Sequence, residues 1–84
     1  MALKILYFAN LREAIGTGSE SVDLPAGVET LAQLRDGLAA RGERYAILLT
    51  AKNLRAAVNQ KMAGMDAAIA DGDEIAFFPP VTGG

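Results

Sequence analysis

The sequence predicts a single α+β domain, in which short strands form one sheet and one longer helix packs across it. Two early segments alternate as strands do, a capped segment with helical spacing follows them, and the chain closes on another apolar strand. The chain of 84 residues suits one compact core. Its apolar content of 51% and charged content of 21% are typical of a folded globular protein. We therefore expect one domain over residues 1–84, with 79–84 as an extended C-terminal tail.

The N-terminal part predicts two paired strands. Residues Leu3–Ala9 are rich in branched and aromatic side chains and alternate between two faces. Lys4 indicates that its own face is solvated, and Phe8 shares that parity, so the Phe8 ring is expected on or near the surface. Residues Asn10–Ile15 fit a single helical turn closed by glycines, and Ser19–Leu24 alternates again. This second strand is expected to pair with the first as a hairpin.

The main helix is predicted to begin at Thr30. Gln33 completes a capping-box pattern with this threonine. Leucines at 31, 34 and 38 then form one apolar stripe that would face a sheet. Gly37 inside the helix costs about 1 kcal/mol relative to alanine, and Gly42 is expected to end the helix in a left-handed conformation.

The second half of the chain predicts shorter elements. Residues 43–49 fit a short helix or an irregular packed segment that buries Tyr45, Ile47, Leu48 and Leu49. Strands are expected over Leu54–Gln60, in Lys61–Ala63, and over Glu74–Phe78 after a turn at Asp71–Asp73. Two paired strands, a crossover helix and a returning C-terminal strand make the α+β plan of the ubiquitin-like β-grasp fold.

Composition excludes several classes of function. The chain has no cysteine and no histidine, so thiol nucleophiles, imidazole bases, disulfides and most zinc sites are excluded. Its cations are scattered and its net charge is −2, which argues against nucleic acid as a partner. No apolar run approaches the roughly 20 residues that span a bilayer. The N-terminus does not resemble a signal peptide, so we expect no membrane association and a cytoplasmic location.

The C-terminal tail is the main candidate for chemistry. Pro79-Pro80 stops the last strand and stiffens the base of the tail, whereas Gly83-Gly84 leaves a narrow tip that can thread a channel. A carboxylate is inert toward acyl transfer in water, so chemistry at Gly84 requires activation. The simplest activation is a mixed anhydride with AMP made by a partner enzyme from ATP. A sulfur nucleophile could then displace AMP and leave a thiocarboxylate.

Three blocks of the sequence resemble a known family. Residues 71–84, DGDEIAFFPPVTGG, look like the C-terminus of the small subunit of molybdopterin synthase. Tyr7-Phe8-Ala9 followed by Leu11-Arg12-Glu13 and Gly16 resembles the opening strand and turn of that family. Ala57-Val58-Asn59-Gln60 resembles a third block in the expected place. The resemblance covers the full chain.

The resemblance implies a function, partners and a set of site residues. It implies a β-grasp sulfur carrier whose Gly84 is adenylated by an ATP-dependent enzyme of the ubiquitin-activating type and then becomes a thiocarboxylate. The tail would enter the large subunit of molybdopterin synthase and give sulfur to a cyclic pyranopterin precursor, with Gly83 permitting the threading. The expected cofactors are therefore transient, namely the C-terminal AMP and the thiocarboxylate, and no metal is expected. An apolar sheet surface would bind both partners alternately. The expected partner-binding residues are Phe8, Met62, Phe78, Pro79, Pro80, Val81 and Thr82.

Two alternatives stay open. The chain could carry sulfur for another pathway, such as thiazole synthesis or transfer-RNA thiolation, although the sequence around the tail favours molybdopterin synthase. It could also be a non-catalytic interaction domain of ubiquitin-like fold that binds partners through its sheet and has an idle tail. Independently of function, Phe8, Met62 and Phe78 could complete a minor core and not form an interface. Arg12, Lys61, Asp71 and Asp73 could make polar contacts around the tail, but a solvated surface or a turn explains each equally well.

Overall fold

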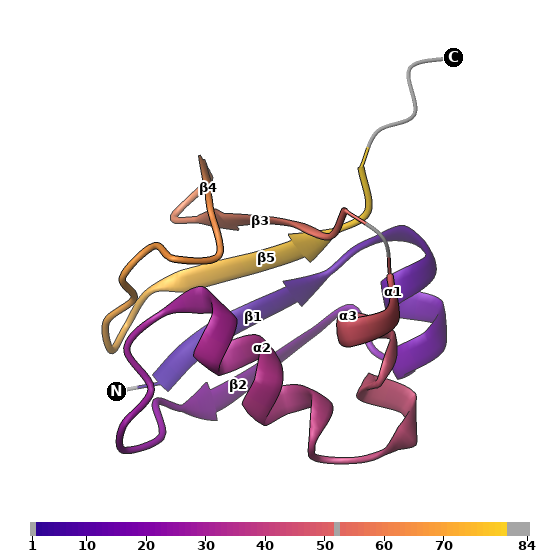
Figure 1. Cartoon of the computed structure of the whole chain (residues 1–84), viewed down its shortest axis with the longest axis horizontal. Helices are drawn as coiled ribbons and strands as arrows, with labels where there is room; N and C mark the ends of the chain where they lie inside the picture. The colour runs from indigo at the N-terminus through magenta and orange to yellow at the C-terminus, as the bar shows by residue number, and fades with distance from the viewer. Residues whose placement is uncertain (1, 52, 81–84) are drawn as a thin grey trace.

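The computed structural model describes residues 2–51 and 53–80 and shows a mixed sheet with its main helix packed across one face (Figure 1). The strands are β1 (Ala2–Tyr7), β2 (Ser19–Asp23), β3 (Arg55–Val58), β4 (Lys61–Ala63) and β5 (Glu74–Phe78). The helices are α1 (Ala9–Ile15), α2 (Leu31–Ala39), the 3-10 helix η1 (Glu43–Tyr45) and α3 (Ile47–Thr50).

The five strands lie in the order β2-β1-β5-β3-β4. The parallel pair β1 and β5 occupies the middle of the sheet, and the other pairs are antiparallel. The last strand of the chain is therefore the central one, which leaves β2 and β4 at the two edges. This is the ubiquitin-like β-grasp arrangement, and it confirms the predicted fold class.

The first strand ends earlier than predicted. β1 stops at Tyr7, and Ala9, expected at the end of the strand, instead begins α1 with a positive φ of 53°. The α1 helix then runs for about two turns, longer than the single turn expected, and ends at Gly16 with φ 94°. β2 pairs antiparallel with β1 as predicted. The two strands are connected by α1 and not by a tight turn.

The main helix begins as predicted and ends differently. The Gln33 N–H donates to the Thr30 hydroxyl at 3.3 Å, and the Thr30 N–H donates to the Gln33 side-chain oxygen at 3.1 Å, which completes the capping box. The helix ends at a right-handed cap on Ala40, whose N–H reaches back to the Asp36 and Leu38 carbonyls. The expectation of a left-handed Gly42 was wrong, because Gly42 has an extended φ of 167° and is the N-cap of η1.

Two further expectations need correction in the second half. Leu49 is not buried, since it is 57% exposed on the outer side of α3, whereas Tyr45 and Leu48 enter the core. β3 ends at Val58, two residues earlier than predicted. Asn59 and Gln60 have φ of 51° and 71°, which form a tight turn that matches the twist of the hairpin into β4.

The core lies between the sheet and the helices. Leu3, Ile5 and Tyr7 of β1 and the alternate residues Ile75 and Phe77 of β5 are at most 1% exposed, and the α2 leucines cover them. The parity predicted for both strands is therefore confirmed. Within residues 2–51 and 53–80 we find no helix long and apolar enough to cross a membrane.

Candidate partner-binding face and tail

The face of the sheet that the helices leave open carries a row of apolar side chains. Strand register places Leu6 beside Ala76, Ala76 beside Ala57, and Ala57 beside Met62, so one row crosses four strands. These residues have the parity opposite to the buried core residues of their strands. None of the four residues is charged, so the row is apolar across all four strands.

Two phenylalanines extend this row toward one end of the sheet. Phe8 follows β1 with an extended backbone, and its N–H donates to the Phe77 carbonyl at 3.2 Å, so its side chain keeps the parity of Leu6. Phe78 ends β5 on the same face and is half-buried. We call the six apolar residues of this face the open-face patch: Leu6, Phe8, Ala57, Met62, Ala76 and Phe78.

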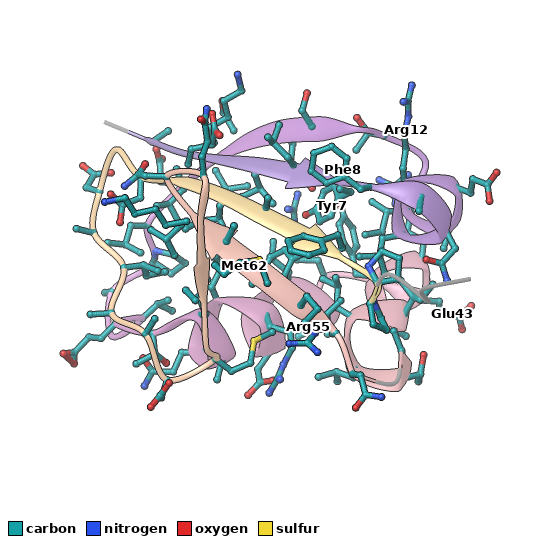
Figure 2. The ribbon with its side chains drawn as sticks, turned by 90° about the horizontal axis from the view of Figure 1, so that it is seen from above. Tyr7, Phe8, Arg12, Glu43, Arg55 and Met62 are labelled. Carbon is teal, nitrogen blue, oxygen red and sulfur yellow. The ribbon has the colours of Figure 1, made fainter. Side chains whose placement is uncertain are left out.

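The most exposed members of the open-face patch are two of the residues expected to bind a partner. Phe8 is 48% exposed and Met62 is 63% exposed. Figure 2 labels both residues, with Arg55 of β3 nearby. The structure thus brings Phe8, Met62 and Phe78 onto one face and leaves the rings and the thioether available to a partner. Exposed apolar patches on a small domain usually mark interaction sites.

The tail leaves the sheet at the end where the phenylalanines lie. β5 runs parallel to β1, so Phe8 and Phe78 reach the same end of the sheet. β3 begins there with Arg55, which pairs with Phe78 in the register. Pro79 and Pro80 follow directly and are half-buried. The remaining predicted tail residues, Val81, Thr82, Gly83 and Gly84, lie outside the described residues.

A polar cluster fixes this end of the sheet from the helix side. The Glu20 carboxylate accepts hydrogen bonds from the Tyr7 hydroxyl at 2.8 Å, the Tyr45 hydroxyl at 3.1 Å and the Arg41 guanidinium at 2.9 Å. The Tyr7 and Tyr45 rings meet edge to face with their centroids 6.4 Å apart. Because Tyr7 directly precedes Phe8, the cluster also holds the residue that orients Phe8.

The cluster shifts the pKa values of its members. Burial raises the pKa of the Tyr7 hydroxyl above its ordinary value, and the hydrogen bond to Glu20 adds to this effect. Burial also tends to raise the pKa of the Glu20 carboxyl, but the hydrogen bonds from Tyr7, Arg41 and Tyr45 outweigh it and lower this pKa. Glu20 is therefore held as a carboxylate that links β1, β2 and η1.

The four polar residues left unassigned from the sequence are placed differently from one another. Asp73 lies in the turn before β5, where its carboxylate accepts from the Ala70 N–H at 2.9 Å and from the Asn59 amide at 3.1 Å. Asp71 lies in the same turn, at the opposite end of β5 from the tail. Lys61 pairs with Val58, which in turn lies opposite Ile75 near the start of β5. None of these three lies where β5 passes into the tail.

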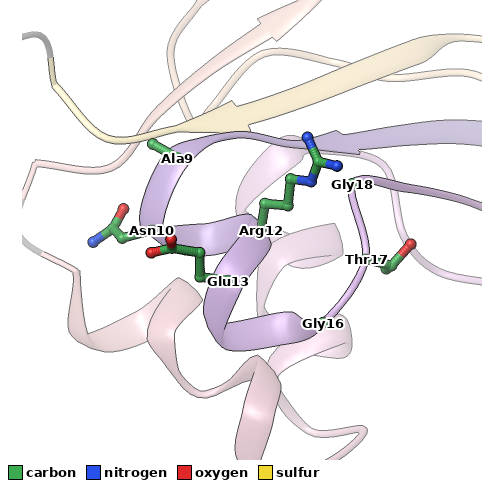
Figure 3. A pocket seen from close by; sticks show the side chains of 7 residues that line it. All are labelled: Ala9, Asn10, Arg12, Glu13, Gly16, Thr17 and Gly18. Carbon is green, nitrogen blue, oxygen red and sulfur yellow. The ribbon is translucent and has the colours of Figure 1, made fainter.

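Arg12 is the member of that group that lies near the tail end of the sheet. It projects from α1, which follows Phe8, and lines an open hollow with Asn10, Glu13 and Thr17 (Figure 3). Its guanidinium packs over Gly18, where an added Cβ atom would lie 3.2 Å from the Arg12 Nε. The guanidinium is thus held over Gly18, where the absence of a side chain leaves room for it.

Sequence reasoning missed part of this site. The alternation along each strand already placed Leu6 on the same face as Phe8, and Ala76 on the same face as Phe78. It did not indicate that Leu6 and Ala76 belong to the site. Ala57 joins the patch only through its register with Ala76 and Met62. No pattern within a single strand could have shown that Ala57 lies beside Ala76 and Met62.

Comparison with known proteins agrees with this architecture. The sequence profile of the ThiS family matches residues 5–84. The molybdopterin synthase sulfur carrier subunit of Escherichia coli K12 is 45% identical over 82 residues, which cover 98% of this chain and 99% of the relative. The corresponding subunit of Haemophilus influenzae is 42% identical with the same coverage. The crystal structure of the protein SAMP1 from Haloferax volcanii superposes with a TM-score of 0.77 at 27% identity and covers 100% of both chains. The chain therefore belongs to the ThiS family and groups with the molybdopterin synthase sulfur carrier subunits.

Proposed function

We propose that this protein is the sulfur carrier subunit of a molybdopterin synthase and carries sulfur as a thiocarboxylate on Gly84. The observation that supports it most directly is the likeness to two named sulfur carrier subunits over nearly the whole chain. The geometry is consistent with that role, because the central strand leads into the tail and Phe8 and Phe78 of the open-face patch lie at the same end of the sheet.

The chemistry needs two steps, and partner enzymes supply the catalysts for both. A Gly84 carboxylate oxygen attacks the α-phosphate of ATP, which forms an acyl adenylate and releases pyrophosphate. A sulfur nucleophile of the hydrosulfide class then attacks the acyl carbon, a carbon–sulfur bond forms, and AMP leaves with the oxygen. The chain has no cysteine or histidine of its own to act as nucleophile or base, so it is the carried substrate in both steps.

The second half of the cycle delivers the sulfur. The tail enters the active site of the large subunit, where the thiocarboxylate sulfur bonds to a carbon of a cyclic pyranopterin precursor. Water then cleaves the bond between this sulfur and the Gly84 acyl carbon, which leaves the sulfur on the precursor and restores the Gly84 carboxylate. Gly83 has no side chain and so fits a narrow channel. The open-face patch, together with Pro79, Pro80, Val81 and Thr82, binds the activating enzyme and the large subunit in turn. Burial of Phe8, Met62 and Phe78 supplies the apolar part of each interface.

The alternatives predict different dependence on Gly84. A carrier for thiazole synthesis or transfer-RNA thiolation would load sulfur equally well but would not support molybdopterin formation with the large subunit. A non-catalytic interaction domain would keep its function when Gly84 is deleted. Deletion of Gly84, or addition of one residue after it, therefore separates the carrier from the interaction domain.

The experiment is an intact-mass measurement before and after incubation with the activating enzyme, ATP and a sulfur source. We expect a mass gain equal to the replacement of one oxygen by sulfur, located on Gly84 by fragmentation, and no gain in the Gly84 deletion. The loaded protein should then form molybdopterin with the large subunit and the pterin precursor. No gain in the presence of an activating enzyme shown to be active would refute the carrier proposal, and loading without molybdopterin would refute its destination.

A further inference from the structure

The edge strand β2 has backbone groups that the sheet does not use. The Tyr7 N–H donates to the Gly18 carbonyl at 3.0 Å, so the antiparallel ladder turns residues 18, 20 and 22 toward β1. The N–H and C=O groups of Ser19, Ser21 and Asp23 therefore face away from the sheet. The Thr17 hydroxyl covers those of Ser19. In the described part of the chain, nothing bonds to the outward groups of Ser21 and Asp23.

An apolar groove of about 410 Å³ lies directly beside this free edge, between β2 and α2. Figure 1 shows α2 next to β2 along one side of the molecule. Val22 lines the groove from the strand, and Leu34, Gly37 and Leu38 line it from one stripe of the helix. Apart from Asp23 and Arg41, all of the lining residues are apolar or glycine.

Gly37 keeps the groove open. A Cβ atom added at this position would meet nothing within 4 Å, so the space above it is empty. Glycine inside a helix is unfavourable by about 1 kcal/mol relative to alanine. The helix thus has a less stable residue at a position where a larger side chain would project into the groove.

The charges at the rim indicate the chemistry of an occupant. Arg41 is already paired with Glu20, with 2.9 Å between Nη1 and Oε1. Asp23 is exposed and makes no ion pair with any residue in 2–51 or 53–80. An added strand would place one of its side chains opposite Asp23, where a cation is favoured. Asp23 has the parity opposite to Val22, so this cation would lie on the open side of the added strand, and Asp23 favours a basic segment.

We propose that the β2 edge and the β2–α2 groove bind an extended basic segment of a partner protein by strand addition. The backbone of this segment pairs with Ser21 and Asp23, its alternate aliphatic side chains enter the groove, and its lysines or arginines face Asp23 on the other side. A second copy of this chain is a poorer occupant. Its own β2, Ser-Glu-Ser-Val-Asp at 19–23, has one aliphatic residue and no base.

The groove and the open-face patch lie on opposite faces of the sheet. Val22 points to the helix side of β2, whereas Phe8 and Met62 lie on the open side. A partner held in the groove would therefore leave the open-face patch accessible. The proposed binding does not depend on the chemistry at Gly84, so the sulfur-carrier proposal and this one can fail separately.

The test is an NMR titration of the ¹⁵N-labelled protein with a capped hexapeptide in which valines alternate with lysines. We expect amide shifts at Ser21, Asp23 and Gly37. With the peptide at about ten times its Kd, hydrogen exchange at the Ser21 and Asp23 amides should slow roughly tenfold. A peptide with threonine in place of valine tests the apolar requirement, and one with glutamate in place of lysine tests the charge. Both should bind more weakly.

Matched variants locate the binding. Gly37→Leu should abolish it by filling the groove, whereas Ala40→Leu, which adds the same side chain at an exposed site outside the groove lining, should not change it. Asp23→Asn should weaken binding of the lysine peptide by roughly two- to fivefold, the range of a surface ion pair. Shifts confined to the open-face patch, or no shifts with the lysine peptide, would overturn the proposal. So would a concentration-dependent dimer that Gly37→Leu abolishes, because the occupant would then be a second copy.

Discussion

Replacement of Phe8 by alanine tests the open-face patch most directly. Phe8 is 48% exposed in the free protein, so about half of its side chain remains for a partner to cover. An aromatic side chain buries about 150–250 Å² when fully enclosed, which leaves roughly 100 Å² for the interface. At about 25 cal/mol per Å² this area corresponds to about 2.5 kcal/mol. Part of that energy is lost in ordering the interface, so we expect a loss of about 1–2.5 kcal/mol in binding.

The assay is calorimetric titration of the molybdopterin synthase large subunit with the wild type and with Phe8→Ala. The expected loss corresponds to a rise in Kd of roughly five- to seventyfold. The variant also loses the buried half of the ring, so its folding must be checked by urea denaturation, and binding compared under conditions where it is fully folded. Phe8 only follows the strand and lies outside the core cluster, so the variant should keep its fold.

Leu49→Ala is the matched control. Leu49 is 57% exposed, which is close to the exposure of Phe8, but it lies on α3 at the helix side of the sheet. Its replacement should leave the affinity for the large subunit within about twofold. Unchanged affinity in Phe8→Ala, or an equal loss in Leu49→Ala, would show that the open-face patch is not the interface.

Three further predictions concern stability. Glu20→Gln should lower the free energy of unfolding by about 1–2 kcal/mol, because two tyrosine hydroxyls and a guanidinium lose their charged acceptor; equal urea midpoints for Glu20→Gln and the wild type would contradict this. The Glu20 pKa is lowered from its ordinary value of about 4.5, so the unfolded state binds more protons just below that pH. Stability from Glu20 should therefore be complete above about pH 4.5 and fall as the pH drops through the lowered pKa, and this fall should be smaller in Glu20→Gln. Gly37→Ala should raise the free energy of unfolding by about 0.5–1 kcal/mol, since the added methyl group meets no neighbour within 4 Å; a lower melting temperature would show that the site is more crowded than described.

Local patterns in the sequence predicted the elements that depend on near neighbours. The capping box needs only Thr30 and Gln33, three residues apart, and the alternation within β1 and β5 needs only one strand at a time. These signals were sufficient to place Phe8 and Phe78 on the open face. They also gave the element order from which the β-grasp fold followed.

Features that depend on distant residues could not be predicted in the same way. The Glu20 cluster joins residues 13 and 25 positions apart, and no spacing rule brings Tyr7 and Tyr45 to one carboxylate. The end of α2 was misplaced because glycine is a common helix terminator, which pointed to Gly42. In the structure the helix ends at its cap on Ala40, and the chain then enters η1. The β2–α2 groove likewise exists only once the strand and the helix are packed together.

The position of β5 connects the fold to the proposed carrier role. As the central strand, β5 is paired on both sides, with Phe77 beside Tyr7 of β1 and Phe78 beside Arg55 of β3, directly before the tail base at Pro79. An enzyme that contacts the base of the tail approaches the end of this strand, where Phe8 and Phe78 of the open-face patch lie. On the proposed function, the activating enzyme and the large subunit both need the tail and must therefore cover the same apolar side chains. The two partners cannot bind at once, so sulfur delivery requires the first complex to dissociate. An interface formed by a few exposed side chains, chiefly Phe8 and Met62, is suited to that exchange. Such an interface can bind a partner specifically and still let the complex dissociate.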